Sequence, residues 1–207
     1  MQRLFFVRHG KTEYNLADRV QGGDIDSPLL EQSKKDAVKT GIVLNPYAIK
    51  QIIASPQKRV VDTAQLIVSQ FQHSYDIHYN EDFKEFGYGE WEGAYIPHFE
   101  KEKPETFYHL RNRPDLYDPT DFNGETYSQL IVRGTKTVHQ AIEQFPNQDL
   151  LFVGHSITTT ATLLSLLGKD LKQIRSQIPL ENTSISILLH QDDQFSLEGW
   201  NQISHLR

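Results

Sequence analysis

Two histidines follow apolar segments of nearly the same pattern, far apart in the chain. Residues 4–7 (Leu-Phe-Phe-Val) lead into Arg8-His9-Gly10, and residues 150–153 (Leu-Leu-Phe-Val) lead into Gly154-His155-Ser156. Both runs are rich in β-formers and predict buried strands. Ligands of open α/β sheets bind beyond the carboxyl ends of the strands, so neighbouring strands would bring the two imidazoles together there. An arginine beside an imidazole at that edge of the sheet is typical of a site where the arginine binds an anion and the imidazole attacks it.

A third strand end predicts further positive charge. Residues 49–54 form a short β-branched run that leads into Ser55-Pro56 and then Arg59. Serine followed by proline is typical of a helix start, which would place Arg59 in the first turn. A cation there opposes the helix dipole, but a bound anion would offset that penalty. Ser156 is expected to cap the helix after His155 in the same way, so that free N–H groups face the anion.

The elements that must position these residues alternate between strand and helix. The pattern predicts strands near 4–7, 49–54, 75–79, 149–153, 184–190 and 195–200, with a hairpin at 191–194. It predicts helices over 29–44 (capped by Ser27-Pro28), 56–71, 124–145, 156–167 and, briefly, 169–175. This alternation indicates a three-layer α/β/α sandwich, with a mostly parallel sheet and helices on both faces. A length of 207 residues suits one domain over 1–207.

Residues 94–123 differ from their surroundings. They contain four prolines, many charges and aromatics, and only fragments of helical period. About 30 residues cannot bury a stable core alone, so we interpret this segment as an excursion from the core near the active site. Such segments often act as lids or specificity walls.

The composition excludes several classes of protein. A net charge of −6 argues against nucleic-acid binding, and the absence of cysteine excludes disulfides and thiolate chemistry. No apolar run is long enough to cross a membrane, and a core strand directly after Met1 leaves no room for a signal peptide. We therefore expect a cytoplasmic protein without membrane contact. The motifs of serine hydrolases, P-loop proteins, dinucleotide-binding folds and zinc proteases are all missing.

The motifs in their order resemble the histidine phosphatase superfamily, which is also called phosphoglycerate mutase-like. The resemblance rests on Arg8-His9-Gly10 with Thr12 and Asn15, on Ser55-Pro56 with Arg59 and Asp62-Thr63-Ala64, on the loop at 85–93, and on Gly154-His155-Ser156. Four motifs in the right order are specific, whereas each one alone is weak. One departure, Gln32-Ser33 where the family usually has a glycine, concerns packing rather than chemistry.

The resemblance implies a reaction and a set of roles. His9 would be the nucleophile that carries a transient phosphohistidine, and Glu85 would donate the proton to the leaving group. A carboxyl that is protonated near neutral pH needs burial or carboxylate neighbours, so we expect one of these for Glu85. Glu90 and Glu92 are alternatives on composition alone. The remaining assignments are His155 as an imidazolium and Arg8, Asn15, Arg59 and Ser156 as phosphate-binding residues, with Gln21, Gly22 and Tyr88 as substrate contacts. No metal or other cofactor is implied.

The resemblance leaves the reaction type open. The loop with Gln21-Gly22 and Asp26-Ser27-Pro28-Leu29 resembles the phosphatase-type branch, which favours hydrolysis of a small phosphorylated metabolite. Mutases need extra cations, and the excursion has Arg111 and Arg113 but six acidic residues to four basic ones. Phosphoglycerate mutase-type transfer is therefore the alternative, and a catalytically idle binding module is a third. A homo-oligomer is possible.

Overall fold

The computed structural model describes all of residues 1–207, and its centre is one six-stranded sheet in the order β3-β2-β4-β1-β5-β6. The strands are β1 (Gln2–Arg8), β2 (Gln51–Ala54), β3 (Asp76–Tyr79), β4 (Leu150–Gly154), β5 (Ile185–Gln191) and β6 (Gln194–Gln202). β1, β4, β2 and β3 run parallel, while β5 is antiparallel to β1 and β6 to β5. The predicted mostly parallel sheet and its terminal hairpin are confirmed.

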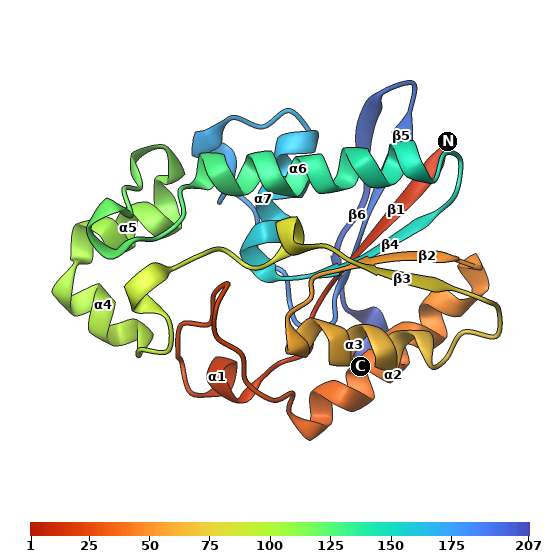
Figure 1. Cartoon of the computed structure of the whole chain (residues 1–207), viewed down its shortest axis with the longest axis horizontal. Helices are drawn as coiled ribbons and strands as arrows, with labels where there is room; N and C mark the ends of the chain where they lie inside the picture. Colours follow the sequence, from red (N-terminus) through yellow and green to blue (C-terminus); the bar gives the residue numbers. More distant parts are fainter.

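Helices cover both faces of the sheet (Figure 1). They are α1 (Glu13–Leu16), α2 (Glu31–Leu44), α3 (Lys58–Val68), α4 (Ile96–Glu102), α5 (Pro104–Asn112), α6 (Tyr127–Gln144) and α7 (Ser156–Leu166). Figure 1 shows α2 and α3 on one side of the sheet and α6 on the other, with α4 and α5 beyond the end of α6. No helix combines the length and the apolar character needed to cross a membrane.

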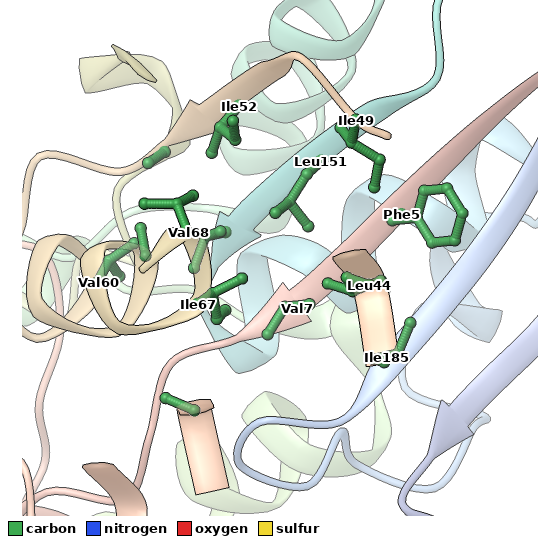
Figure 2. Packing of buried hydrophobic residues seen from close by; sticks show 14 of the residues in the cluster. Phe5, Val7, Leu44, Ile49, Ile52, Val60, Ile67, Val68, Leu151 and Ile185 are labelled. Atoms are coloured by element: carbon green, nitrogen blue, oxygen red, sulfur yellow. The ribbon is translucent and has the colours of Figure 1, made fainter. Parts of the chain in front are cut away.

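Alternate residues of each central strand pack into different layers. In β1, Phe5 and Val7 pack with α2 and α3, and Figure 2 shows Ile67 of α3 and Leu44 of α2 close to Val7. Leu4 and Phe6 point to the other face, where they join residues of α6 and α7. Burial of such a side chain contributes about 1.5–3 kcal/mol. Both layers therefore fix the register of β1, and with it the place where the strand ends.

The two histidine strands are direct neighbours, which is the condition under which the sequence brings the two imidazoles together. β1 pairs with β4 in parallel, and Arg8 lies opposite Gly154. The backbone N–H of His9 donates to the carbonyl of Gly154 at 2.9 Å. The matched sequence patterns thus place His9 and His155 at the same edge of the sheet.

The predicted helix starts were wrong. α2 begins at Glu31, and α3 at Lys58, so that neither Ser27-Pro28 nor Ser55-Pro56 opens a helix. The Ser27 hydroxyl instead accepts from the N–H of Tyr14, which fixes the loop after β1. The helix expected over 169–175 is only one 3-10 turn, Leu171–Gln173. Arg59 nevertheless lies in the first turn of α3, as predicted.

The excursion contains two helices, α4 and α5, where the sequence showed only fragments of helical period. It is held by an aromatic stack. The Trp91 ring lies 4.5 Å from Phe99 and 4.1 Å from Phe122, centroid to centroid. These rings join an apolar cluster that also includes Tyr127 of α6 and Ile157 of α7. The excursion is therefore anchored to the helices that border the end of β4.

Candidate active site

His9 is oriented so that only one ring nitrogen can act as a nucleophile. Its Nδ1 lies 2.8 Å from the carbonyl oxygen of Gly10, and a carbonyl can only accept, so Nδ1 carries the proton. Nε2 therefore holds the free lone pair. The side chain is 4% exposed. Burial, and then the charges of Arg59 and Arg8, lower the pKa of His9 well below its usual value of 6.5. At neutral pH His9 is a neutral imidazole.

His155 lies against His9 and is also neutral, which corrects the predicted imidazolium. The two ring centroids are 5.3 Å apart. The Arg59 guanidinium donates to Nδ1 of His155 at 3.3 Å, so this nitrogen bears no proton, and Nε2–H donates to the Ser55 hydroxyl at 2.8 Å. Burial, and then the charge of Arg59, lower the pKa of His155 well below 6.5. A protonated His155 would place a second positive charge beside the buried Arg59 guanidinium, which is unfavourable.

These two histidines make stability depend on pH. In the unfolded chain they bind a proton near pH 6.5, whereas in the folded protein their pKa values lie well below that. Below pH 6.5 the unfolded state therefore binds more protons, and folding stability falls as the pH falls, by up to about 1.4 kcal/mol per pH unit for each histidine. Urea titrations at several pH values should show a steeper fall below pH 6.5 in the wild type than in His155→Asn. His139→Asn, at an exposed position, should keep the wild-type slope. Equal slopes for all three proteins would contradict buried neutral histidines.

Arg59 is 1% exposed and joins the histidines to the loop after α1. Its terminal nitrogens donate to the carbonyls of Gly22 and Ile25, both at 2.9 Å, and to the Asp26 carboxylate at 3.0 Å. Its Nε, like that of Arg8, is buried without an acceptor in the protein. A buried guanidinium N–H without a partner is costly, and an anion in the cavity that Arg8 lines would satisfy the Arg8 Nε–H.

Glu85 is 6% exposed, which confirms the expected burial. Its two carboxylate oxygens accept from the backbone N–H groups of Ser156, Ile157 and Thr158 at 3.0–3.2 Å. The Thr158 hydroxyl and the N–H of Phe86 also donate to it, at 2.9 and 2.8 Å. Glu85 thus caps α7. This corrects the prediction that the Ser156 side chain would cap this helix and leave its N–H groups facing the anion.

Arg133 of α6 fixes the backbone around Glu85. Its guanidinium donates to the carbonyls of Lys84 at 2.6 Å and Glu85 at 3.1 Å, and to that of Asp82 at 2.9 Å. The Glu125 carboxylate balances its charge through two bonds of 2.6 and 2.8 Å. Sequence analysis missed this residue, because a single arginine in an amphipathic helix has no distinguishing pattern.

The other two candidate acids face elsewhere. Glu92 accepts from the backbone N–H groups of Gly23, Asp24, Ile25 and Tyr88 at 2.8–3.2 Å. It therefore holds in place the loop whose carbonyls engage Arg59. Glu90 is exposed and accepts from Asn123 at 3.0 Å. Of the three acids, only Glu85 lines the cavity that contains His9.

A cavity of about 270 Å³ lies beyond the ends of β1 and β4. Seven of the predicted site residues line it: Arg8, His9, Asn15, Gln21, Glu85, Tyr88 and Ser156. Three do not: His155 and Arg59 lie behind His9, and the Gly22 carbonyl supports Arg59 and Gln57 instead of facing the cavity. Sequence analysis named Arg111 only as a possible mutase cation and missed Arg19 and Arg175, which also line the cavity.

Thr12 orients two polar side chains of the wall, and a third side chain keeps its proton. The side-chain oxygen of Asn15 accepts from the N–H of Thr12 at 3.2 Å, which leaves the amide nitrogen free to donate. The side-chain oxygen of Gln21 accepts from the Thr12 hydroxyl at 2.7 Å. Burial, and then the charge of Glu85, raise the pKa of Tyr88 well above its usual range, so its hydroxyl stays protonated. The wall near His9 is therefore rich in donors.

The protein contains no group of three or more histidine, aspartate or glutamate side chains arranged to hold a metal ion. Arginine nitrogens, a neutral imidazole and side-chain amides surround His9 instead. This set of groups binds and polarises an oxyanion through charge and hydrogen bonds.

Sheet order, paired histidines and the buried carboxylate together define a family. The chain belongs to the histidine phosphatase superfamily (branch 1), whose family model matches residues 4–203. It is 30% identical over 206 residues to an uncharacterized phosphatase, PhoE, of Bacillus subtilis, covering 100% of this chain and 97% of that protein. It is 28% identical to a probable phosphoglycerate mutase, GpmB, of Salmonella paratyphi A, covering 100% and 95%. The solved structure of Bacillus stearothermophilus YhfR superposes with a TM-score of 0.93, at 25% identity and full coverage of both chains.

Proposed function

We propose that the protein is a metal-independent phosphomonoester hydrolase that acts through a phosphohistidine on His9. The observation that carries this proposal is the hydrogen bond from His9 Nδ1 to the Gly10 carbonyl. It leaves Nε2 unprotonated in a cavity whose wall also contains Arg8 and Glu85. The histidine phosphatase family model and the phosphatase relative from Bacillus subtilis support a phosphatase activity.

The first step transfers the phosphoryl group from substrate to enzyme. Nε2 of His9 attacks phosphorus in line, the bond from phosphorus to the ester oxygen breaks, and the alkoxide takes a proton from Glu85, which must enter this step as the carboxylic acid. In the second step a water gives its proton to the Glu85 carboxylate and attacks the phosphohistidine. The bond from nitrogen to phosphorus breaks, and inorganic phosphate leaves. Glu85 and His9 are then in their starting states.

The positive field for the phosphoryl oxygens comes from protein groups. Arg8 holds a buried Nε–H without an acceptor, and the free amide nitrogen of Asn15 faces the same cavity. Arg59 donates to His155, whose other nitrogen is held by Ser55, so His155 positions Arg59 beside His9. Fixed donors of this kind stabilise the charge that develops in phosphoryl transfer.

Transfer between two hydroxyls, as in a phosphoglycerate mutase, is the alternative, and Arg111 in the cavity wall favours it because a mutase substrate carries a second acidic group. The two reactions differ in the final acceptor, which is water in one case and a substrate hydroxyl in the other.

A paired assay separates these reactions. We expect phosphate release from a panel of aryl and metabolite phosphates, at the same rate with and without a chelator. We expect slow isomerisation of 3-phosphoglycerate supplied with catalytic 2,3-bisphosphoglycerate. Rapid isomerisation with little hydrolysis would overturn the phosphatase proposal, and loss of activity with the chelator would contradict metal independence.

A further inference from the structure

The loop that holds Arg59 and the segment that carries Glu85 pack directly against each other. The loop after α1 holds Arg59, because the Gly22 carbonyl accepts from its guanidinium at 2.9 Å. Glu85 lies in the segment after β3. A Cβ atom on Gly22 would lie 2.7 Å from the carbonyl oxygen of Phe86, which is closer than real Cβ atoms approach another atom. Only glycine therefore allows this contact between the two backbones.

The side chain of Gln57 links these two segments. Gln57 is the residue immediately before α3 and is 7% exposed. Its Nε2 donates to the carbonyls of Gly22 and Gly23, at 2.8 and 3.2 Å. Its Oε1 accepts from the backbone N–H of Glu85 at 2.9 Å. These partners admit only this orientation of the amide, since a carbonyl accepts and an N–H donates. The whole amide is used to join the two segments, and none of it caps α3.

The bond from Glu85 to Gln57 holds one end of a peptide unit whose other end is held as well. The N–H of Glu85 and the carbonyl of Lys84 belong to the same planar unit. That carbonyl accepts from the guanidinium of Arg133 at 2.6 Å and from the hydroxyl of Thr158 at 2.8 Å. Arg133 lies on α6, across the sheet from α3 (Figure 1). The peptide unit is therefore held from both sides, and it cannot rotate without breaking a hydrogen bond.

Gln57 ties this peptide unit to the part of the molecule that carries Arg59. The two residues are one position apart at the start of α3. Arg59 in turn donates to Nδ1 of His155 at 3.3 Å, and the ring of His155 lies against that of His9. Gln57 is thus a direct link from the backbone of Glu85 to the helix start behind His9.

We propose that Gln57 is a positioning residue for the proton donor. Its amide sets the place of Glu85 relative to Arg59 and His9, so that the acid meets the leaving group as Nε2 of His9 attacks phosphorus. An apolar side chain at this position would leave the N–H of Glu85 without its acceptor. A displacement of about 1 Å at a reacting group can cost about 10²-fold in rate. The proposal rests on the proposed hydrolase activity, and it adds a residue that does not line the cavity.

Gln57→Leu and Gln57→Met test this role, because both remove the amide and keep a side chain of similar size. We would measure kcat/KM for 4-nitrophenyl phosphate, whose leaving group needs no proton, and for 2-phenylethyl phosphate, whose alkoxide needs one. In both variants the ratio of the first value to the second should rise about tenfold over the wild type. The affinity for inorganic phosphate should stay within about twofold of the wild type, because Arg8, His9 and Asn15 remain in the cavity wall.

Two further variants separate this role from a loss of stability. Gln65→Leu makes the same change at an exposed position of α3 and should keep the wild-type ratio. Val68→Ala removes buried volume at the far end of α3, so it should lower the melting temperature and leave the ratio unchanged. A wild-type ratio in a folded Gln57 variant, or an equal rise in Val68→Ala, would overturn the positioning role while leaving hydrolysis intact. A wild type that hydrolyses neither ester would instead overturn the proposed function, and the positioning role with it.

Discussion

Replacing His9 by alanine should lower kcat for phosphate release by about 10⁴-fold or more, because the residue is the proposed covalent nucleophile. Other groups of the site, such as Arg8, remain in place, so the variant should still bind a substrate. Steady-state phosphate release with an aryl phosphate measures the loss. A binding titration with inorganic phosphate tests the phosphate-binding groups around His9 separately.

His139→Ala is the matched control for this substitution, since His139 is an exposed histidine on α6. It should retain wild-type activity. Circular dichroism and thermal unfolding show whether His9→Ala is folded. A folded His9→Ala protein with a tenth of the wild-type rate or more would contradict the phosphohistidine mechanism. A folded wild type that binds phosphate and releases none from any ester would instead support the idle binding module.

Replacing Glu85 by glutamine should slow hydrolysis in a manner that depends on the leaving group. An alkoxide needs a proton as it leaves, so alkyl phosphates should lose about 10²–10⁴-fold in kcat/KM. A 4-nitrophenolate leaves readily without protonation, so the loss with 4-nitrophenyl phosphate should be much smaller. A series of esters with leaving groups of graded acidity measures this dependence.

Glu92→Gln separates a chemical role from a structural one. Glu92 also accepts several backbone N–H bonds, but it supports the loop that engages Arg59 and does not line the cavity. Its substitution should affect all esters by a similar factor. Glu85 also caps α7, so thermal unfolding of both variants shows how much of each loss is structural. A uniform loss across the ester series in Glu85→Gln would rule out Glu85 as the proton donor.

The sequence predicts the strands that position the site, because strand formation depends on local residue patterns. The apolar runs before His9 and His155 give the strands, and their similarity gives the shared edge of the sheet. The carboxyl ends of parallel strands lie at one edge of the sheet, and the conformation of the loops does not change this. This reasoning identifies Arg8, His9 and Ser156 among the residues that line the cavity, and the resemblance to the family adds Asn15, Gln21, Glu85 and Tyr88.

The details that were wrong or missed depend on contacts between distant segments. Ser156 is a good helix-capping residue, yet Glu85, which is 71 residues away, caps α7. The protonation of His155 depends on Arg59, which faces its Nδ1 from another helix. Local propensity contains no information about either partner. The two helices of the excursion were missed for a related reason, since α4 and α5 are held by packing against Trp91 and the core rather than by their own periodicity.

The most direct test of the mechanism is to identify the phosphorylated atom. Wild-type enzyme would be mixed rapidly with substrate and quenched in alkali, where phosphohistidine survives, and the labelled peptide would be analysed by mass spectrometry and phosphorus NMR. Because Nδ1 of His9 donates to the Gly10 carbonyl, the phosphoryl group should be found on Nε2 of His9. A phosphoryl group on Nδ1 or on another residue would contradict phosphorylation of His9 at Nε2. Quenched enzyme that carries no label while phosphate is released would contradict it as well.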